Sequence, residues 1–206
     1  MPSNPHITQW EERYRTGDQP WDARRPEPQL VEPVMTLDWP ASLAVDLGCG
    51  TGDNAMALAE RGHDVIGLDI SETAIATARQ RAETSGLNRV RFTCCDVLQP
   101  WPIEHPAGLV LDRGCYHVFD ESDRATLAER VANVLAPDGY WIMLCGNADE
   151  QRGEDEAGPP QLTAGQVIGP VEHHFIVERL EQARFTGSDG HPTHLAWHVT
   201  LYRRSW

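Results

Sequence analysis

The feature that most constrains this chain is the stretch from Leu43 to Asp53. It opens with a short apolar run, continues with the acidic Asp46, and then carries glycine at every second position, at Gly48, Gly50 and Gly52. Residues 54–60, which follow, are predicted to be helical. Because glycine has no Cβ, the backbone can turn tightly there and come close to a ligand. The stretch therefore predicts a strand, a glycine loop and a helix, with a carboxylate beside the loop.

The spacing of the glycines narrows the choice of ligand. A phosphate-binding P-loop would need a lysine after the last glycine, and none follows here. A dinucleotide fingerprint reads Gly-x-Gly-x-x-Gly, whereas this loop reads Gly-x-Gly-x-Gly, and Asp46 would repel a pyrophosphate. What remains is a ligand with an adenosine, no phosphate and a positive ammonium, a description that S-adenosylmethionine meets. The alternative is a turn with only a structural role.

Several motifs resemble a known family. Asp46 to Gly52 resemble the first motif of class I S-adenosylmethionine-dependent methyltransferases. Three further pieces together are similar to the small-molecule group that includes thiopurine, halide/thiol and tellurite methyltransferases: W-x3-Y-x5-PWD from Trp10 to Asp22, Asp112–His117, and Gly158-Pro159-Pro160. The first motif of this chain, Asp-Leu-Gly-Cys-Gly-Thr-Gly, departs from that of the thiopurine enzymes, which carry a Pro-Leu-Cys-Gly version. The resemblance therefore does not identify the acceptor. The resemblance implies S-adenosylmethionine as cofactor and S-adenosylhomocysteine as product.

Composition excludes several classes of protein. The chain has 206 residues, enough for one domain with a full core, and its formal net charge of -14 argues against DNA or RNA as a partner. No apolar run approaches the ~20 residues of a membrane helix. Residues 1–10 lack the basic and apolar segments of a signal peptide. The five cysteines include no Cys-x-x-Cys pair, which predicts reduced thiols in the cytoplasm. We expect a monomer or homodimer.

Strand and helix patterns alternate after the glycine loop. The further strands are expected at 64–68, 90–94, 108–111, 140–145, 175–185 and 195–203, and the further helices at 72–85, 123–135 and 163–169. The order predicts an α/β, Rossmann-like doubly wound sheet of seven strands, mostly parallel, with a C-terminal antiparallel hairpin. We divide the chain into an N-terminal leader or lid, 1–40, and a methyltransferase domain, 41–206.

The leader is unusually rich in aromatic side chains for a polar, proline-broken segment. Short helices are expected at 9–15 and 29–37, and the first places Trp10 and Tyr14 on one face. Two interpretations stay open for Trp21: it forms the aromatic wall of a lid over the cofactor, or it only fastens the leader to the core. For Trp10 we favour the packing role.

Acidic residues end the predicted strands where an adenosine would be bound. Asp69 lies ~20 residues past the glycine loop, where α/β folds place the carboxylate that binds ribose hydroxyls. The resemblance implies that Asp96 bonds the adenine amino group and that Val97 packs on the ring. The expected cofactor-binding residues are Trp21, Asp46, Gly48, Cys49, Gly50, Gly52, Asn54, Asp69, Ile70, Asp96, Val97 and Asp112.

The segment Asp112–His117 follows the fourth expected strand, beside the topological switch, and should face the methyl group and its acceptor. We expect Asp112 to orient the cofactor's amino or sulfonium end, and Arg113 to hold an anionic acceptor or form a structural salt bridge. His117 is the candidate general base for a hydroxyl, thiol or ring nitrogen, whereas a thiolate, selenide or halide needs none. The expected catalytic residues are Asp112, Arg113 and His117, and the substrate-binding residues are Tyr14, Trp21, Cys115, Tyr116 and His117.

Two groups of potential metal ligands lack the pattern of a site. The adjacent side chains of Cys94 and Cys95 would point to opposite faces of a strand. For His191, His194 and His198 we expect no carboxylate or thiol partners that would complete a metal site. We therefore expect no metal.

The function predicted from these patterns is methyl transfer by in-line displacement from S-adenosylmethionine to a heteroatom of a small molecule: sulfur, nitrogen, oxygen, a halide or a chalcogen. Two alternatives remain, a regulatory protein that binds the cofactor without turnover and a methyltransferase acting on a macromolecule. The long, acidic segment 147–160, after the fifth expected strand, should lie over the mouth of the pocket.

Overall fold

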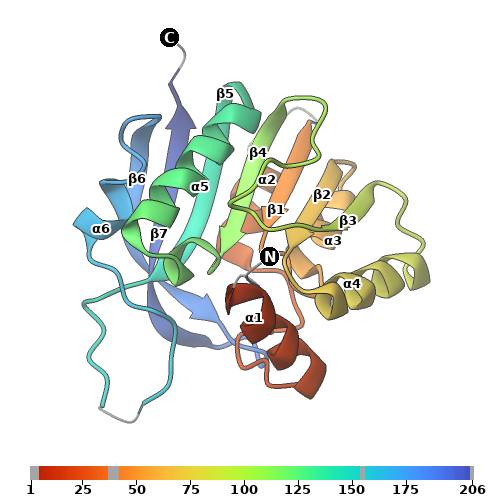
Figure 1. Cartoon of the computed structure of the whole chain (residues 1–206), viewed down its shortest axis with the longest axis horizontal. Coiled ribbons are helices and arrows are strands. Elements are labelled where there is room, and N and C mark those ends of the chain that lie inside the picture. Colours follow the sequence, from red (N-terminus) through yellow and green to blue (C-terminus); the bar gives the residue numbers. More distant parts are fainter. Residues whose placement is uncertain (1–4, 37–41, 154–155, 205–206) are drawn as a thin grey trace.

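The computed structural model describes residues 5–36, 42–153 and 156–204, and its centre is one seven-stranded sheet (Figure 1). The strand order is β3-β2-β1-β4-β5-β7-β6. β1 to β5 pair in parallel, and β7 pairs antiparallel with both β5 and β6. The strands are β1 Leu43–Leu47, β2 Asp64–Asp69, β3 Val90–Cys94, β4 Ala107–Arg113, β5 Leu135–Gly146, β6 Phe175–Thr186 and β7 Pro192–Arg203. The predicted fold class is confirmed.

Helices cover both faces of the sheet, which explains why the inner strands β1, β2 and β4 are almost continuously apolar. α5 (Glu121–Val134) and α6 (Ala164–Ile168) cover one face, where Leu127 and Val131 of α5 are fully buried. The opposite face carries α2 (Pro28–Thr36), α3 (Asp53–Ala59) and α4 (Glu72–Thr84). Each fully buried aliphatic side chain of this kind contributes about 1.5–3 kcal/mol. Two cores therefore hold the sheet rigid beneath the loops at its carboxyl edge.

The start of β5 differs from the prediction. We expected a helix at 123–135 and a strand at 140–145, but β5 begins directly after α5 and includes Pro137-Asp138-Gly139. Leu135 pairs with Ala107, and the register shifts before Tyr140 pairs with Leu109. Within this irregular part of β5, Asp138 has a positive φ of 64°. The prediction was wrong here because side-chain patterns do not reveal a pairing with a distant strand.

The leader begins with α1 (Pro5–Thr16), which lies at the carboxyl ends of the parallel strands (Figure 1). The carboxylate of Glu11 accepts hydrogen bonds from Ser71 Oγ at 2.7 Å and from Thr73 N at 3.2 Å. These bonds lower the pKa of Glu11 and place its charge at the N-terminus of α4, where the helix dipole favours an anion. The expected boundary between residues 40 and 41 lies outside the described residues.

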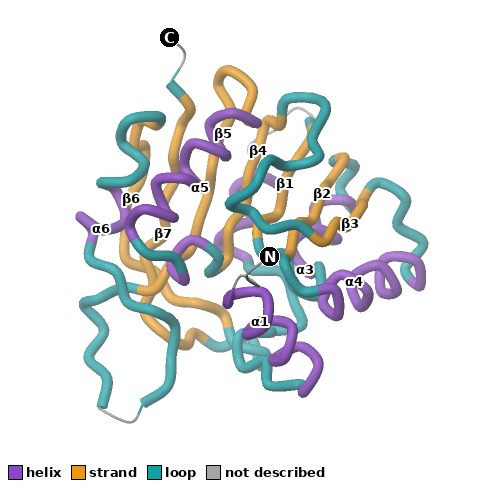
Figure 2. The backbone as a smooth tube through the Cα atoms, in the orientation of Figure 1, coloured by secondary structure: helices purple, strands orange, loops and turns teal. Residues whose placement is uncertain are grey.

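The segment between β5 and α6 extends away from the sheet as a long loop (Figure 2). Its two ends are joined by a bridge between Asn147 and Leu162. Arg152 donates to Pro159 O at 2.7 Å, and Glu150 accepts from the backbone of Leu195 at 2.6 Å. These bonds tie the described parts of the loop to each other and to β7.

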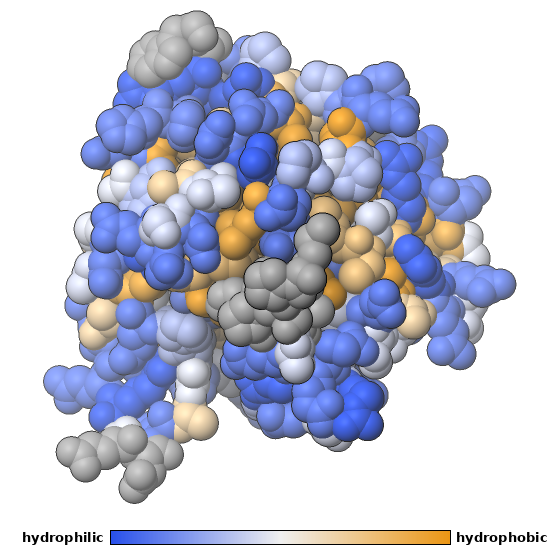
Figure 3. All heavy atoms as spheres, viewed as in Figure 1, coloured by the Kyte–Doolittle hydropathy of each residue, from blue (hydrophilic) through white to orange (hydrophobic). Residues whose placement is uncertain are grey.

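The face in Figure 3 is predominantly hydrophilic, with apolar residues in scattered patches, several of them near its middle. Among the described residues, no helix combines the length and the apolar character that crossing a bilayer requires.

Candidate functional site

The glycine loop has the backbone that its sequence predicted. Gly48, Gly50 and Gly52 have φ of 58°, 53° and 93°, in the left-handed region that favours glycine. A Cβ on Gly48 would lie 2.9 Å from the Cβ of Cys115, and a Cβ on Gly50 would lie 2.7 Å from Tyr14 Oη. Both the backbone and the close neighbours therefore require glycine here.

Three buried carboxylates surround this loop, on neighbouring strands. Asp46 lies in β1, Asp69 ends β2 and Asp112 lies near the end of β4, where it pairs with Leu47. The bonds that the structure gives these carboxylates come from backbone N–H groups. Asp46 accepts from Ala55 N at 3.1 Å, Asp69 from Gly50 N and Ser71 N at 2.9 Å each, and Asp112 from Cys115 N at 2.8 Å and Tyr116 N at 3.0 Å.

The electrostatics of these carboxylates favour a cationic ligand. Burial raises the pKa of Asp46 to about 8, with smaller contributions from the negative charges of Asp112, Asp53 and Asp69. Burial likewise raises the pKa of Asp112 to about 7 and that of Asp69 above its usual value, although backbone hydrogen bonds oppose both shifts. A cation placed among them would offset their desolvation. Each carboxylate oxygen has room for more than one donor, so hydroxyl and amino groups can also be bound.

Aromatic side chains of the leader lie over the loop. Trp21 Nε1 donates to Tyr14 Oη at 3.2 Å, so the hydroxyl hydrogen of Tyr14 is left to donate elsewhere. The Trp21 ring meets those of Tyr14 and Trp10 edge-on, with centroid distances of 5.8 and 5.1 Å. Arg13 lies 4.1 Å above the Trp21 ring. Trp10 is thus seen packing on Trp21, while Tyr14 reaches the backbone of the glycine loop.

His117 has an arrangement that the sequence did not indicate. Its Nδ1 accepts a hydrogen bond from Gly146 N at 2.9 Å, so the neutral ring carries its hydrogen on Nε2. Burial, followed by the positive charges of Arg113 and Arg152, lowers the pKa of His117 to about 3. The lone pair that a general base would use is already occupied. The base role expected for His117 therefore gains no support from this geometry.

Arg113 forms the structural salt bridge that the sequence left open. Its Nε lies 3.0 Å from Glu27 Oε2, while Nη1 and Nη2 donate to the carbonyl oxygens of Trp21 and Thr186 at 2.9 and 2.8 Å. Every nitrogen of the guanidinium thus has a partner within the chain. Sequence analysis missed Glu27, because a glutamate between two prolines follows no periodic pattern.

The other expected site residues surround the same edge of the sheet. Tyr116 is buried, and its hydroxyl donates to Val167 O at 2.8 Å, which gives it a packing role next to Trp141. Burial raises the pKa of the Cys49 and Cys115 thiols, so both stay protonated. Asn54 accepts from Glu27 N at 2.8 Å.

At the end of β3, Asp96 accepts from Leu98 N at 3.0 Å, and Val97 is buried in the core beside α5. The carbonyl of Ile70 lies 3.5 Å from the Cys94 thiol, which places Ile70 beside this strand end. The residues expected to read the adenine therefore lie together.

The histidines considered as metal ligands pair with acidic residues instead. His194 Nδ1 lies 3.3 Å from Glu150, and His198 Nδ1 lies 3.4 Å from Glu181. Among the described residues, no group of three or more His, Cys, Asp or Glu side chains has the arrangement of a metal site.

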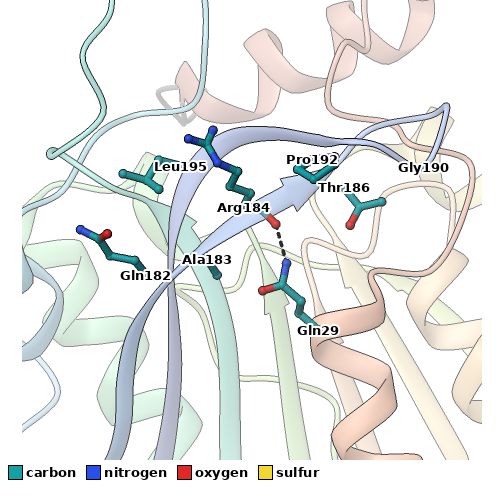
Figure 4. Close-up of a pocket in the computed structure, with 8 residues that line it drawn as sticks. All are labelled: Gln29, Gln182, Ala183, Arg184, Thr186, Gly190, Pro192 and Leu195. Atoms are coloured by element: carbon teal, nitrogen blue, oxygen red, sulfur yellow. Dashed lines mark hydrogen bonds between the residues drawn. The ribbon is translucent and has the colours of Figure 1, made fainter.

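A pocket of about 460 Å³ opens between the start of α2 and the β6–β7 hairpin (Figure 4). Gln29 donates to the carbonyl of Arg184 across it. None of the expected site residues lines this pocket; its lining residues are Gln29, Gln182, Ala183, Arg184, Thr186, Gly190, Pro192 and Leu195. One of its lining residues, Thr186, bonds both Glu27 and Arg113.

Comparisons with known proteins find methyltransferases. A family model described as a methyltransferase domain matches residues 44–139. The chain is 30% identical to a probable thiol methyltransferase 2 of Arabidopsis thaliana over 151 residues, which cover 73% of this chain and 65% of that protein. It is 26% identical to a 2-heptyl-1-hydroxyquinolin-4(1H)-one methyltransferase of Mycobacteroides abscessus over 172 residues, covering 83% and 75% of the two chains.

Among solved structures, the fold is similar to that of 1,6-didemethyltoxoflavin-N1-methyltransferase of Burkholderia thailandensis. That protein was crystallised with 1,6-didemethyltoxoflavin and S-adenosylhomocysteine. The TM-score is 0.76 at 20% identity, and the match covers 100% of this chain and 92% of that one. A likeness at this identity shows a shared fold.

Proposed function

This chain carries a methyltransferase domain, and from that premise we propose that it transfers the methyl group of S-adenosylmethionine to a soft, already ionised nucleophile of a small molecule. The similarity to a thiol methyltransferase supports the class of acceptor. The observation that carries the proposal is the hydrogen bond from Gly146 N to His117 Nδ1, because it occupies the lone pair that the candidate general base would use.

The cofactor, when bound, supplies a methyl group already activated on a sulfonium. In our proposal Asp69 accepts hydrogen bonds from the ribose hydroxyls, while Asp46 and Asp112 face its cationic amino and sulfonium end. Gly48, Gly50 and Gly52 let the backbone approach without side chains in the way. We assign the adenine to Asp96 and Val97, beside the end of β3.

The acceptor must arrive deprotonated because the groups near it are poor proton acceptors. Cys115 and Tyr14 hold their own protons, and Arg113 is a permanent cation. Asp112 has a pKa of about 7 without ligand, but a cationic ligand beside it lowers that pKa and so makes the carboxylate a weaker base. The Nε2–H of His117 is a donor, and a donor favours an anion.

The chain's main contribution to the rate is then positioning and the exclusion of water. Holding two reactants in a near-attack arrangement supplies about 7–11 kcal/mol, whereas a general base adds only about 10²–10⁴-fold. We propose that residues 1–40 act as a lid, with Trp21 and Tyr14 closing the site above the glycine loop.

The test is turnover of methyl-labelled cofactor with a panel of iodide, thiocyanate, thiols, tellurite, phenols and N-heterocycles. We expect transfer to the soft anions and to thiols in proportion to their ionised fraction. Transfer to a phenol at a rate independent of its ionisation would overturn the proposal. Binding of the cofactor without transfer to any acceptor would instead support the regulatory alternative.

We further propose a cytoplasmic monomer or homodimer that has no nucleic-acid partner. The net charge of -14 supports the last point, since nucleic-acid binding depends on cationic side chains. Retention on heparin or DNA at physiological salt would revive a macromolecular substrate.

A further inference from the structure

Glu27 is the most completely buried acidic side chain of the leader among the described residues, at 1% exposed. It stands between Pro26 and Pro28, directly before α2. A carboxylate is desolvated at this depth only when charged or hydrogen-bonding partners compensate it. Its partners therefore show what the residue holds together.

Those partners come from three separate parts of the fold. Glu27 Oε2 accepts from Arg113 Nε and from Thr186 N, both at 3.0 Å, and Oε1 accepts from Thr186 Oγ1 at 2.7 Å. The backbone N–H of Glu27 donates to Asn54 Oδ1 at 2.8 Å. One leader residue thus contacts the helix after the glycine loop, the end of β4 and the end of β6.

Arg113 extends this cluster to the aromatic part of the leader. It also donates to the carbonyl of Trp21 at 2.9 Å, and Trp21 in turn bonds Tyr14 above Gly50. In the sequence, Arg113 immediately precedes Gly114 and the turn that carries His117. The Glu27–Arg113 pair therefore lies between the parts assigned to the cofactor and the part assigned to the acceptor.

We infer that Glu27 is a positioning residue for the proposed methyl transfer: by holding Arg113, Thr186 and Asn54 together, it docks the leader over the glycine loop and fixes the turn that faces the acceptor. Glu27 acts through these partners and touches neither reactant. The inference rests on the proposed function for its kinetic consequence, but the docking of the leader can be measured without turnover.

The experiment is a double-mutant cycle with Glu27→Gln, Arg113→Gln and the double variant. Glutamine keeps the length of Glu27 and an acceptor for Thr186 but removes the ion pair. Docking is measured by tryptic cleavage after Arg24, an exposed leader residue, followed by mass spectrometry. S-adenosylhomocysteine binding is measured by calorimetry, and every measurement is made well below the melting temperature of each variant. Arg89→Met is the matched control, because it breaks an exposed pair with Asp64 at the opposite edge of the sheet.

We expect each single variant to be cleaved about tenfold faster and to bind S-adenosylhomocysteine about tenfold more weakly, with the double variant no worse than the worse single one. Glu27→Asp keeps the charge but has a shorter side chain. Its cleavage rate and its affinity for S-adenosylhomocysteine should lie between those of the wild type and of Glu27→Gln. The rise in KM for the cofactor should exceed the fall in kcat.

A purely structural role predicts a different result: a lower melting temperature with unchanged cleavage and affinity in the folded protein. That result, or strictly additive effects of the two variants, would overturn the inference. If the wild type transfers no methyl group to any acceptor, the proposed function fails, whereas cleavage after Arg24 still decides the role of Glu27.

Discussion

The side of the site that we assign to the cofactor and the side that we assign to the acceptor differ in their electrostatics. The side that we assign to the cofactor presents the carboxylates of Asp46, Asp69 and Asp112, whose bonds come from backbone amides. On the side that we assign to the acceptor, the neutral ring of His117 keeps its hydrogen on Nε2, while the guanidinium of Arg113 is held by Glu27 and by backbone carbonyls. The first half suits a cation and the second suits an electron-rich nucleophile. Under the proposed function, this difference lets the site bring cofactor and acceptor together without moving a proton.

The largest effect is expected from replacing Asp69, on the side of the site that we assign to the cofactor. We expect Asp69→Ala to weaken cofactor binding by about a hundredfold or more, because hydrogen bonds to a charged group contribute about 1.5–3 kcal/mol each. The variant should still fold, since the carboxylate stabilises little beyond the loop it bonds. Calorimetry with S-adenosylmethionine provides the measurement, and Asp64→Ala, at the exposed start of the same strand, is the control. Equal affinity in the two variants would refute the ribose assignment.

The pH dependence tests the charge of the same half. The raised pKa values of Asp112, about 7, and Asp46, about 8, mean that acidification neutralises the carboxylates that a cation needs. Cofactor affinity should fall as the pH drops through this range, by at most about tenfold per pH unit for each group that must ionise.

The stability of the ligand-free protein should move in the opposite direction. A carboxyl whose pKa is raised by folding stabilises the protein at low pH, and this stability is lost as the pH rises through the folded-state pKa. The melting temperature without cofactor should therefore fall toward pH 8, while the increment due to the cofactor grows. Melting curves with and without S-adenosylmethionine would contradict this account if the increment were constant.

A smaller effect probes the contact between leader and loop. Gly50→Ala would place a methyl group 2.7 Å from Tyr14 Oη and should weaken cofactor binding about tenfold, in addition to backbone strain of about 1–2 kcal/mol. Gly62→Ala is the matched control, since Gly62 also has positive φ but no neighbour within 4 Å of the added Cβ. Calorimetry on both variants separates the contact from the strain. Equal affinities would show that the Tyr14 contact does not matter for binding.

The smallest effect is expected in the acceptor half. Asparagine at position 117 can still accept the Gly146 N–H, so His117→Asn should change the rate of iodide methylation by less than about threefold. A general base would be worth about 10²–10⁴-fold. The comparison is made with single-turnover rates for iodide and for a phenol. A large loss confined to the phenol would restore the base role.

Local sequence determined the elements that we assign to cofactor binding. Alternate glycines after an apolar run dictate the turn, and acidic residues at strand ends come together because parallel strands end at one edge. For the same reason Asp46, Asp69 and Asp112 could be chosen as site residues before the fold was known. The N-terminus of α4 is likewise set locally, because Ser71 Oγ accepts from Ala74 N at 3.1 Å.

The tertiary structure alone decided the acceptor half. The tautomer of His117 depends on Gly146, 29 residues away, and the partner of Arg113 lies 86 residues earlier at Glu27. Likewise, β5 begins at Leu135 because that residue pairs with Ala107 on another strand. Periodicity and turn chemistry report only what neighbours in the chain do to one another. A proton's position and a buried ion pair depend on groups that meet only when the chain has folded.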